Sequence, residues 1–73
     1  MASYNVKITR TYCSHHSQNC WAHLQGIGWR KVGNLSVDGT SNVFTALSAA
    51  RTSNITPNVI TNAADNQIEL VYV

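Results

Sequence analysis

The chain has 73 residues, a hydrophobic fraction of 44% and a formal net charge of +2. This length excludes a second domain, and residues 1–73 form one domain whose small core is expected to need a crosslink, a metal ion or self-association. Charged residues are only 11% of the chain, so Ser, Thr and Asn supply most of its polarity. The small net charge gives no argument for nucleic-acid binding by itself, and no apolar run is long enough for a membrane span.

The first predicted strand runs from Tyr4 to Tyr12, because apolar or aromatic side chains alternate with polar ones there. One face of this strand carries Tyr4, Val6, Ile8, Arg10 and Tyr12. The other face is polar throughout, so we expect a strand with one side in water.

Two further strands are predicted at Trp21–Leu24 and Ile27–Val32. Gly26 and Gly28 lie between or within them and indicate a bulge or sharp bend in the sheet. A loop is expected from Gly33 to Thr40, with its turn at Asp38 and the following glycine.

A helix is predicted over Val43–Asn54, because apolar residues recur there at helical spacing. These residues are Val43, Ala46, Leu47 and Ala50. Ser41 or Asn42 is suited to the N-cap, Arg51 suits the helix dipole in the last turn, and Asn54 tolerates the left-handed conformation of a C-cap.

Two strands, Asn58–Asn62 and Gln67–Val73, follow the helix and form a predicted hairpin around the turn Ala63–Asn66. Strict alternation in the last strand would place Ile68, Leu70 and Tyr72 on one face. The order strand, strand, strand, helix, strand, strand predicts a mainly β fold, a small five-stranded Greek-key barrel of the OB type. A plain sheet with one helix packed across it is the alternative.

Cys13 and Cys20 bound a polar loop, and we expect a disulfide between them that staples two strand ends. An alternative is a zinc site made by Cys13, His15, Cys20 and His23, with His16 as another available ligand. A Cys-His pair active in thiol catalysis is the least favoured interpretation.

Trp29 is the best candidate for an exposed ligand-binding aromatic residue, because Gly28 leaves room beside its ring. Arg30 and Lys31 form the only adjacent basic pair, and together with Tyr12 they complete the predicted ligand-binding set. No Ser-His-Asp set, phosphate-binding glycine loop or paired acid and base is present, so we expect neither an enzyme nor a cofactor.

The second half of the chain resembles the Shiga-toxin B subunit, and more generally the OB-fold B subunits of bacterial toxins. The resemblance lies in the helix and two closing strands, residues Asn42–Ala63 and Ile68–Tyr72. It implies a non-catalytic glycan-binding protein that forms a ring of identical subunits, with a possible catalytic partner chain. Ser41 stands where the Shiga-type subunit has a tryptophan, so that sugar subsite does not carry over.

Two other functions remain open at this point. One is an OB domain that binds single-stranded nucleic acid, with Trp29 and Tyr12 stacking on bases and Arg30 and Lys31 contacting phosphates. The other is a small metal-stabilised interaction module. Secretion or a periplasmic location fits the toxin-like interpretation if a signal has been removed, and a cytoplasmic location is the alternative.

Overall fold

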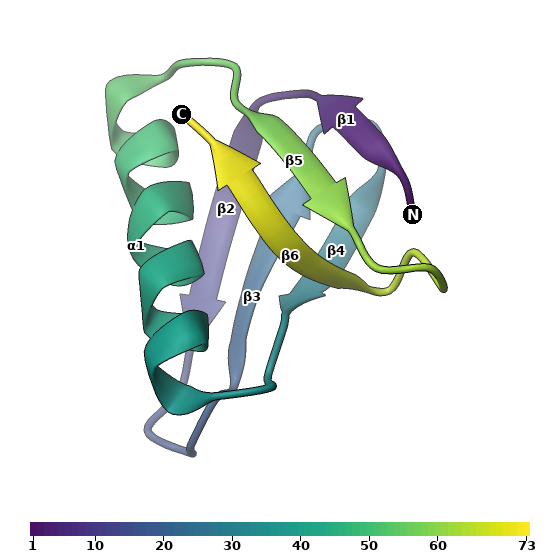
Figure 1. The fold of residues 1–73 in the computed structure, drawn as a ribbon. Coiled ribbons are helices and arrows are strands. Elements are labelled where there is room, and N and C mark those ends of the chain that lie inside the picture. The colour runs from purple at the N-terminus through teal and green to yellow at the C-terminus, as the bar shows by residue number, and fades with distance from the viewer.

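Six β-strands and one α-helix make up the protein, described over residues 1–73 by a computed structural model (Figure 1). In chain order they are β1 (Ser3–Asn5), β2 (Ile8–Cys13), β3 (Cys20–Leu24), β4 (Gly28–Val32), α1 (Val37–Ser53), β5 (Asn58–Thr61) and β6 (Gln67–Tyr72). The strands form one sheet in the order β1-β5-β6-β4-β3-β2. All neighbours are antiparallel except β4 and β6, which are parallel. The prediction of a mainly β domain with one helix is therefore confirmed.

The sheet has six strands where five were predicted, because the segment expected to form one strand from Tyr4 to Tyr12 forms two. Val6 and Lys7 interrupt it, and β1 and β2 then lie at opposite edges of the sheet. These two edges are not paired with each other, so the sheet is open.

The sheet is strongly bent, with β5 and β6 lying in front of β2 and β3, and α1 runs along one side (Figure 1). The helix contacts β2, β3, β4 and β6. Between helix and sheet lies one apolar core, which consists of Ile8, Cys20, Ala22, Leu24, Val32, Leu47, Ala50, Val59 and Ile68. Each bend or bulge of the sheet therefore determines which strand side chains point into this core. The single helix lacks the length and apolar character needed to cross a bilayer.

The helix begins at Val37, earlier than the predicted Val43, so half of the predicted loop Gly33–Thr40 is helical. Ser36 is the N-cap, and its Oγ accepts a hydrogen bond from the Gly39 N–H at 3.0 Å. A glycine in this segment favours a loop in the sequence, but the Ser36 hydroxyl supplies an N-cap and the helix begins there.

The end of the helix is as predicted. Asn54 is left-handed with a φ of 55°, and the Ile55 N–H donates back to the Ala50 carbonyl at 3.2 Å. This hydrogen bond back to the last turn of α1 is typical of a left-handed C-cap, after which the chain turns toward β5.

Two β-bulges change the faces that strict alternation predicts. In β2 the extra residue is Thr9, so Ile8 points into the core while Arg10 and Tyr12 point outward. An extra residue in one strand shifts every later side chain to the other face.

The second bulge has Glu69 as the extra residue of β6. Ile68 and Val71 consequently pack on the core, whereas Leu70 is 48% and Tyr72 62% exposed. The predicted common face of Ile68, Leu70 and Tyr72 is therefore wrong, and the last strand presents two apolar side chains to solvent.

Candidate functional site

The outer face of β2, β3 and β4 carries two rows of side chains set by the strand register. The first row runs across four strands and consists of Tyr12, Trp21, Lys31 and Gln67. The second row consists of Arg10, His23 and Trp29. Directly opposed and diagonal side chains on one face of a sheet are within reach of each other, so these rows form one continuous surface.

Three aromatic side chains of this surface line an open depression of about 370 Å³, and no other residue lines it. We call it the aromatic depression; its residues are Tyr12, Trp21 and Trp29. Tyr12 is 51% and Trp29 is 43% exposed. A chain this small needs large apolar side chains to fill its core, so aromatic rings left together at the surface are unusual. They mark a candidate ligand site.

The two indole rings are held in place by polar neighbours. The Trp21 Nε1–H donates to Asn19 Oδ1 at 3.0 Å, and the His23 ring meets Trp29 edge-on with centroids 5.3 Å apart. His23 is itself positioned by a hydrogen bond between its Nδ1 and the hydroxyl of Thr9, the bulge residue. Two of the three rings of the aromatic depression are therefore held in position in the ligand-free protein.

A second hollow of about 340 Å³ adjoins the first and shares both tryptophans with it. We call it the polar cleft; it is lined by Trp21, Trp29, Arg30, Lys31, Asp65, Asn66 and Gln67. The Lys31 ammonium lies 6.0 Å from the centroid of the Trp21 ring, at the junction of the two hollows. A ligand on the aromatic rings therefore has donors and acceptors within reach at one end.

Asp65 and Arg30 form the far wall of the polar cleft. Asp65 lies in the β5–β6 turn with a φ of 54°, and Arg30 Nη2 approaches its Oδ2 at 3.5 Å. The Tyr4 hydroxyl donates to the same oxygen at 2.6 Å, and the Thr61 hydroxyl donates to Oδ1 at 2.8 Å. This carboxylate therefore joins β1, β4 and β5 to the turn.

These contacts change two pKa values. The hydrogen bonds from Tyr4 and Thr61, followed by the Arg30 charge, hold the pKa of Asp65 below its usual value. The same hydrogen bond to Asp65 raises the pKa of Tyr4. Asp65 is thus a fixed carboxylate with both oxygens in use, and it is poorly suited to general acid or base chemistry.

Of the four predicted ligand-binding residues, the structure places Tyr12, Trp29 and Lys31 on one face. Arg30 is on the opposite side of the strand, since it pairs with the buried Ala22, but its guanidinium reaches Asp65 and lines the polar cleft. Its Nε is buried without a hydrogen-bond partner.

Trp21 and the β5–β6 turn residues Asp65 and Asn66 line the site but are not among the residues predicted from the sequence. A signal for Trp21 was present, since pairing Cys13 with Cys20 in a hairpin also places Tyr12 opposite Trp21. No comparable sequence signal identifies Asp65 and Asn66, because only the pairing of β4 with β6 brings the β5–β6 turn to the polar cleft.

Cys13 and Cys20 are directly opposed on β2 and β3, and their Sγ atoms are 2.9 Å apart as free thiols. Burial, followed by the contact with Cys13, raises the pKa of Cys20 to about 11. Of the alternative metal ligands Cys13, His15, Cys20 and His23, the structure pairs only the two cysteines, and no group of three or more His, Cys, Asp or Glu side chains suited to a metal ion occurs in residues 1–73.

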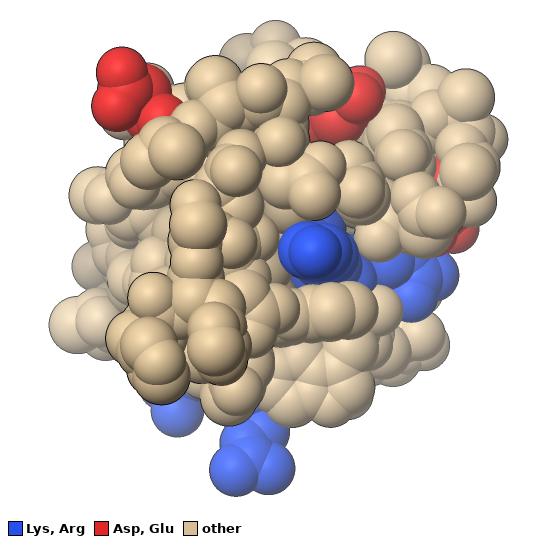
Figure 2. Space-filling view, turned by 90° about the horizontal axis from the view of Figure 1, so that it is seen from below, with Lys and Arg blue, Asp and Glu red and all other residues tan.

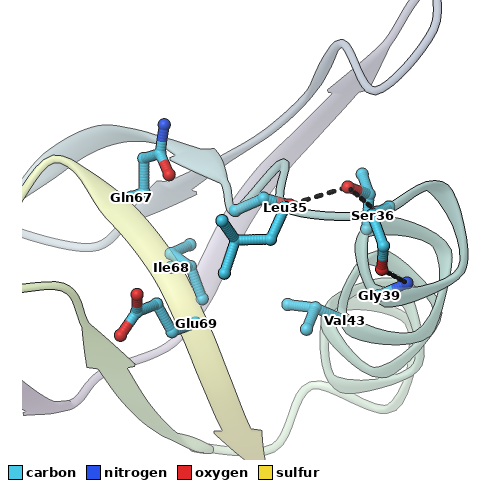
Figure 3. A pocket seen from close by; sticks show the side chains of 9 residues that line it. Leu35, Ser36, Gly39, Val43, Gln67, Ile68 and Glu69 are labelled. Atoms are coloured by element: carbon cyan, nitrogen blue, oxygen red, sulfur yellow. Dashed lines mark hydrogen bonds between the residues drawn. The ribbon is translucent and has the colours of Figure 1, made fainter.

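A third hollow, of about 270 Å³, lies between the start of α1 and β6. Figure 3 shows Leu35 and Val43 directed into it from one side, with Ile68 and Glu69 on the facing strand. Leu35 is 98% exposed, and Glu69 is the only charged residue in the lining. This groove has no stacking surface and no cation, so it is the weaker candidate for a ligand site.

Comparison with protein-family models, with curated proteins and with solved structures gives no match to this chain. The site is therefore interpreted from its own geometry.

Proposed function

We propose that this protein is a non-catalytic carbohydrate-binding domain whose site is the aromatic depression together with the polar cleft. The observation that carries the proposal is the aromatic surface of Tyr12, Trp21 and Trp29 beside polar side chains. The C–H face of a sugar ring is apolar and is removed from water when it stacks on such rings. Hydroxyl groups at its rim need hydrogen-bond partners, and the polar cleft supplies them.

Gln67 is the neutral side chain best suited to bind sugar hydroxyl groups. Its backbone N–H donates to Asn62 Oδ1, but its side-chain amide makes no hydrogen bond within the protein. It lies beside Lys31 in the first row and lines the polar cleft, so its free donor and acceptor are available in the cleft that adjoins the aromatic depression. A free amide next to stacking rings gives orientation as well as affinity.

The OB-type part of the prediction supports the same site. We infer that β1 and β2, separated only by Val6 and Lys7, are two halves of one bent strand. Counted this way, the strand order has β1 and β2 at both ends of a five-stranded Greek key, with β4 and β6 as its parallel pair. OB folds bind oligosaccharides and oligonucleotides on the face of their second and third strands, which correspond here to β3 and β4.

The toxin-like elements of the proposal are self-association, secretion or a periplasmic location, and a possible catalytic partner chain. Support for self-association comes from the exposed apolar side chains at the end of β6, Leu70, Tyr72 and Val73. Ring assembly would place several weak glycan sites on one particle and raise the overall affinity.

A glycan array read with labelled protein tests this function, with Trp29→Ala as the matched variant. We expect binding to at least one glycan class and a loss of about tenfold in affinity on removing the indole. Leu35→Ala is the control, because it removes a more exposed apolar side chain from the groove between α1 and β6. Equal loss in both variants, or no glycan binding, would contradict the proposal.

Single-stranded nucleic acid is the second candidate, because stacking rings beside Lys31 also suit bases and phosphates. The low net charge of +2 favours the carbohydrate. Binding of an oligothymidylate that weakens steeply with salt, with no glycan bound, would reverse this order.

A further inference from the structure

Three of the five Lys and Arg side chains are engaged away from the aromatic depression. The pairs are Arg30 with Asp65, Lys7 with Asn54, and Arg51 with the carbonyl of Thr9. Lys7 and Arg51 thereby join the first strands to the helix. The Lys7 and Arg51 side chains therefore stabilise the fold, and the charge of Arg30 is neutralised by the Asp65 carboxylate.

The other two basic side chains, Arg10 and Lys31, have neither an ion pair nor a hydrogen bond within the protein. Both lie on the outer face. Lys31 is opposite Trp21 and two residues from Trp29, while Arg10 is two residues from Tyr12. Seen from below, basic side chains gather in a hollow near the centre and project from the lower rim; two acidic groups lie towards the top, and a third lies beside basic atoms at the right (Figure 2).

None of the three carboxylates neutralises these two cations. Asp65 is bonded through both oxygens, Asp38 lies in the first turn of α1, and Glu69 lines the groove between α1 and β6. The only ion pair of the protein is that of Arg30 with Asp65. The aromatic depression is therefore bordered by two uncompensated positive charges and no free negative one.

We propose that the ligand is an anionic sugar, which stacks on the aromatic depression and places its carboxylate or sulfate against Lys31. This inference rests on the proposed carbohydrate function and adds the charge of the ligand to it. The Lys31 ammonium sits where the aromatic depression meets the polar cleft, so an anion attached to a stacked ring reaches it without leaving the surface. Arg10 stands at the opposite side of the rings and attracts the next charged unit of a chain.

The arrangement discriminates against neutral sugars through Lys31 itself. A hydrogen bond from an ammonium to an anion is roughly twice as strong as one between neutral groups. A neutral sugar in the same position would cover part of the ammonium without compensating its charge. Selectivity for anionic sugars therefore needs no further residue.

The test is a glycan array with neutral, carboxylated and sulfated members, read with the wild-type protein and with Lys31→Met. The variant keeps the aliphatic stem over Trp21 and removes the charge. We expect wild-type protein to prefer anionic members. We expect Lys31→Met to lose about tenfold in affinity for anionic members and to bind neutral members as well as wild type or better, because no uncompensated ammonium is then covered. The carboxylated and sulfated arms show which anion is recognised.

Lys7→Met is the matched control, since it removes an equal charge from a side chain bound to Asn54. It should leave the preference for anionic glycans intact, and polyglutamate, an anion without sugar rings, should not compete. Trp29-dependent binding to neutral members alone would overturn this inference and leave the carbohydrate function standing. Equal losses in Lys31→Met and Lys7→Met would also overturn it, and binding to no glycan would overturn both proposals.

Discussion

Cys13 and Cys20 face each other across β2 and β3 with their sulfur atoms 2.9 Å apart, and the next pair along these strands is Tyr12 with Trp21. The thiols therefore close the hairpin directly beside the aromatic depression. Cys13 is exposed and Cys20 is buried, so an oxidant reaches the pair through Cys13. Whether these two sulfurs are thiols or a disulfide therefore affects how rigidly the β2–β3 side of the proposed site is held.

We predict that glutathione disulfide converts the two thiols into a Cys13–Cys20 disulfide and is itself reduced to glutathione. The intact mass then falls by two hydrogen atoms, and reductant reverses the change. Closing this short loop should raise the free energy of unfolding by about 2 to 3 kcal/mol. Cys13→Ser is the control, and in it neither mass nor stability should respond to the redox state; a wild-type protein that never loses the two hydrogens would refute the prediction.

Asp65→Asn should destabilise the protein at neutral pH and have little effect in acid. The pKa of Asp65 is lowered in the folded state, so its contribution to stability is present above the unfolded pKa and is lost as pH falls through the folded one. Denaturant melts of wild type and variant across this range measure the difference. Glu69→Gln serves as the control, because it removes an exposed carboxylate that makes no ion pair, and a gap between wild type and Asp65→Asn that persists in acid would contradict the assignment.

Ser36→Ala should lower the free energy of unfolding by about 1 kcal/mol, because it removes the N-cap of α1. Ser41→Ala should cost less or be neutral, since Ser41 lies within the helix on an exposed position where alanine is favourable. Urea denaturation of the two variants separates a helix that begins at Val37 from one that begins at Val43. The reverse ranking would restore the shorter helix.

Leu70→Ser should weaken any self-association that uses the end of β6. Leu70 is half exposed while its neighbour Val71 packs on the core, so the substitution removes surface apolar area and spares the interior. Light scattering over a concentration series measures the mass. A wild-type mass equal to one chain at every concentration would remove the ring assembly from the proposed function.

Local chemistry predicted most of the elements correctly. The spacing of Leu47 and Ala50, the left-handed Asn54 and the hairpin around Asp65 are each fixed by residues close in sequence, and the structure has all of them. The predicted start of the helix is too late because Asp38 and Gly39 favour a turn, whereas the Ser36 hydroxyl accepts from the Gly39 N–H and caps the first turn.

The outer surface was harder to predict because it depends on two single-residue bulges. Thr9 and Glu69 carry no glycine or proline signal, yet each turns the following side chains to the other face. Tyr12, Trp29 and Lys31 were identified from their residue types and neighbours. Trp21 and Gln67 join them only through pairing between strands, which the sequence of a single strand does not contain.

The outer face of β2, β3 and β4 is the proposed binding surface, and an NMR titration with an array-selected glycan tests this most directly. We predict that the indole N–H signals of Trp21 and Trp29 and the amides of Tyr12 and Lys31 shift together and saturate. Signals of Leu35 and Val43, in the groove between α1 and β6, should stay in place. Saturable shifts confined to that groove, with the indole signals unmoved, would contradict the central claim.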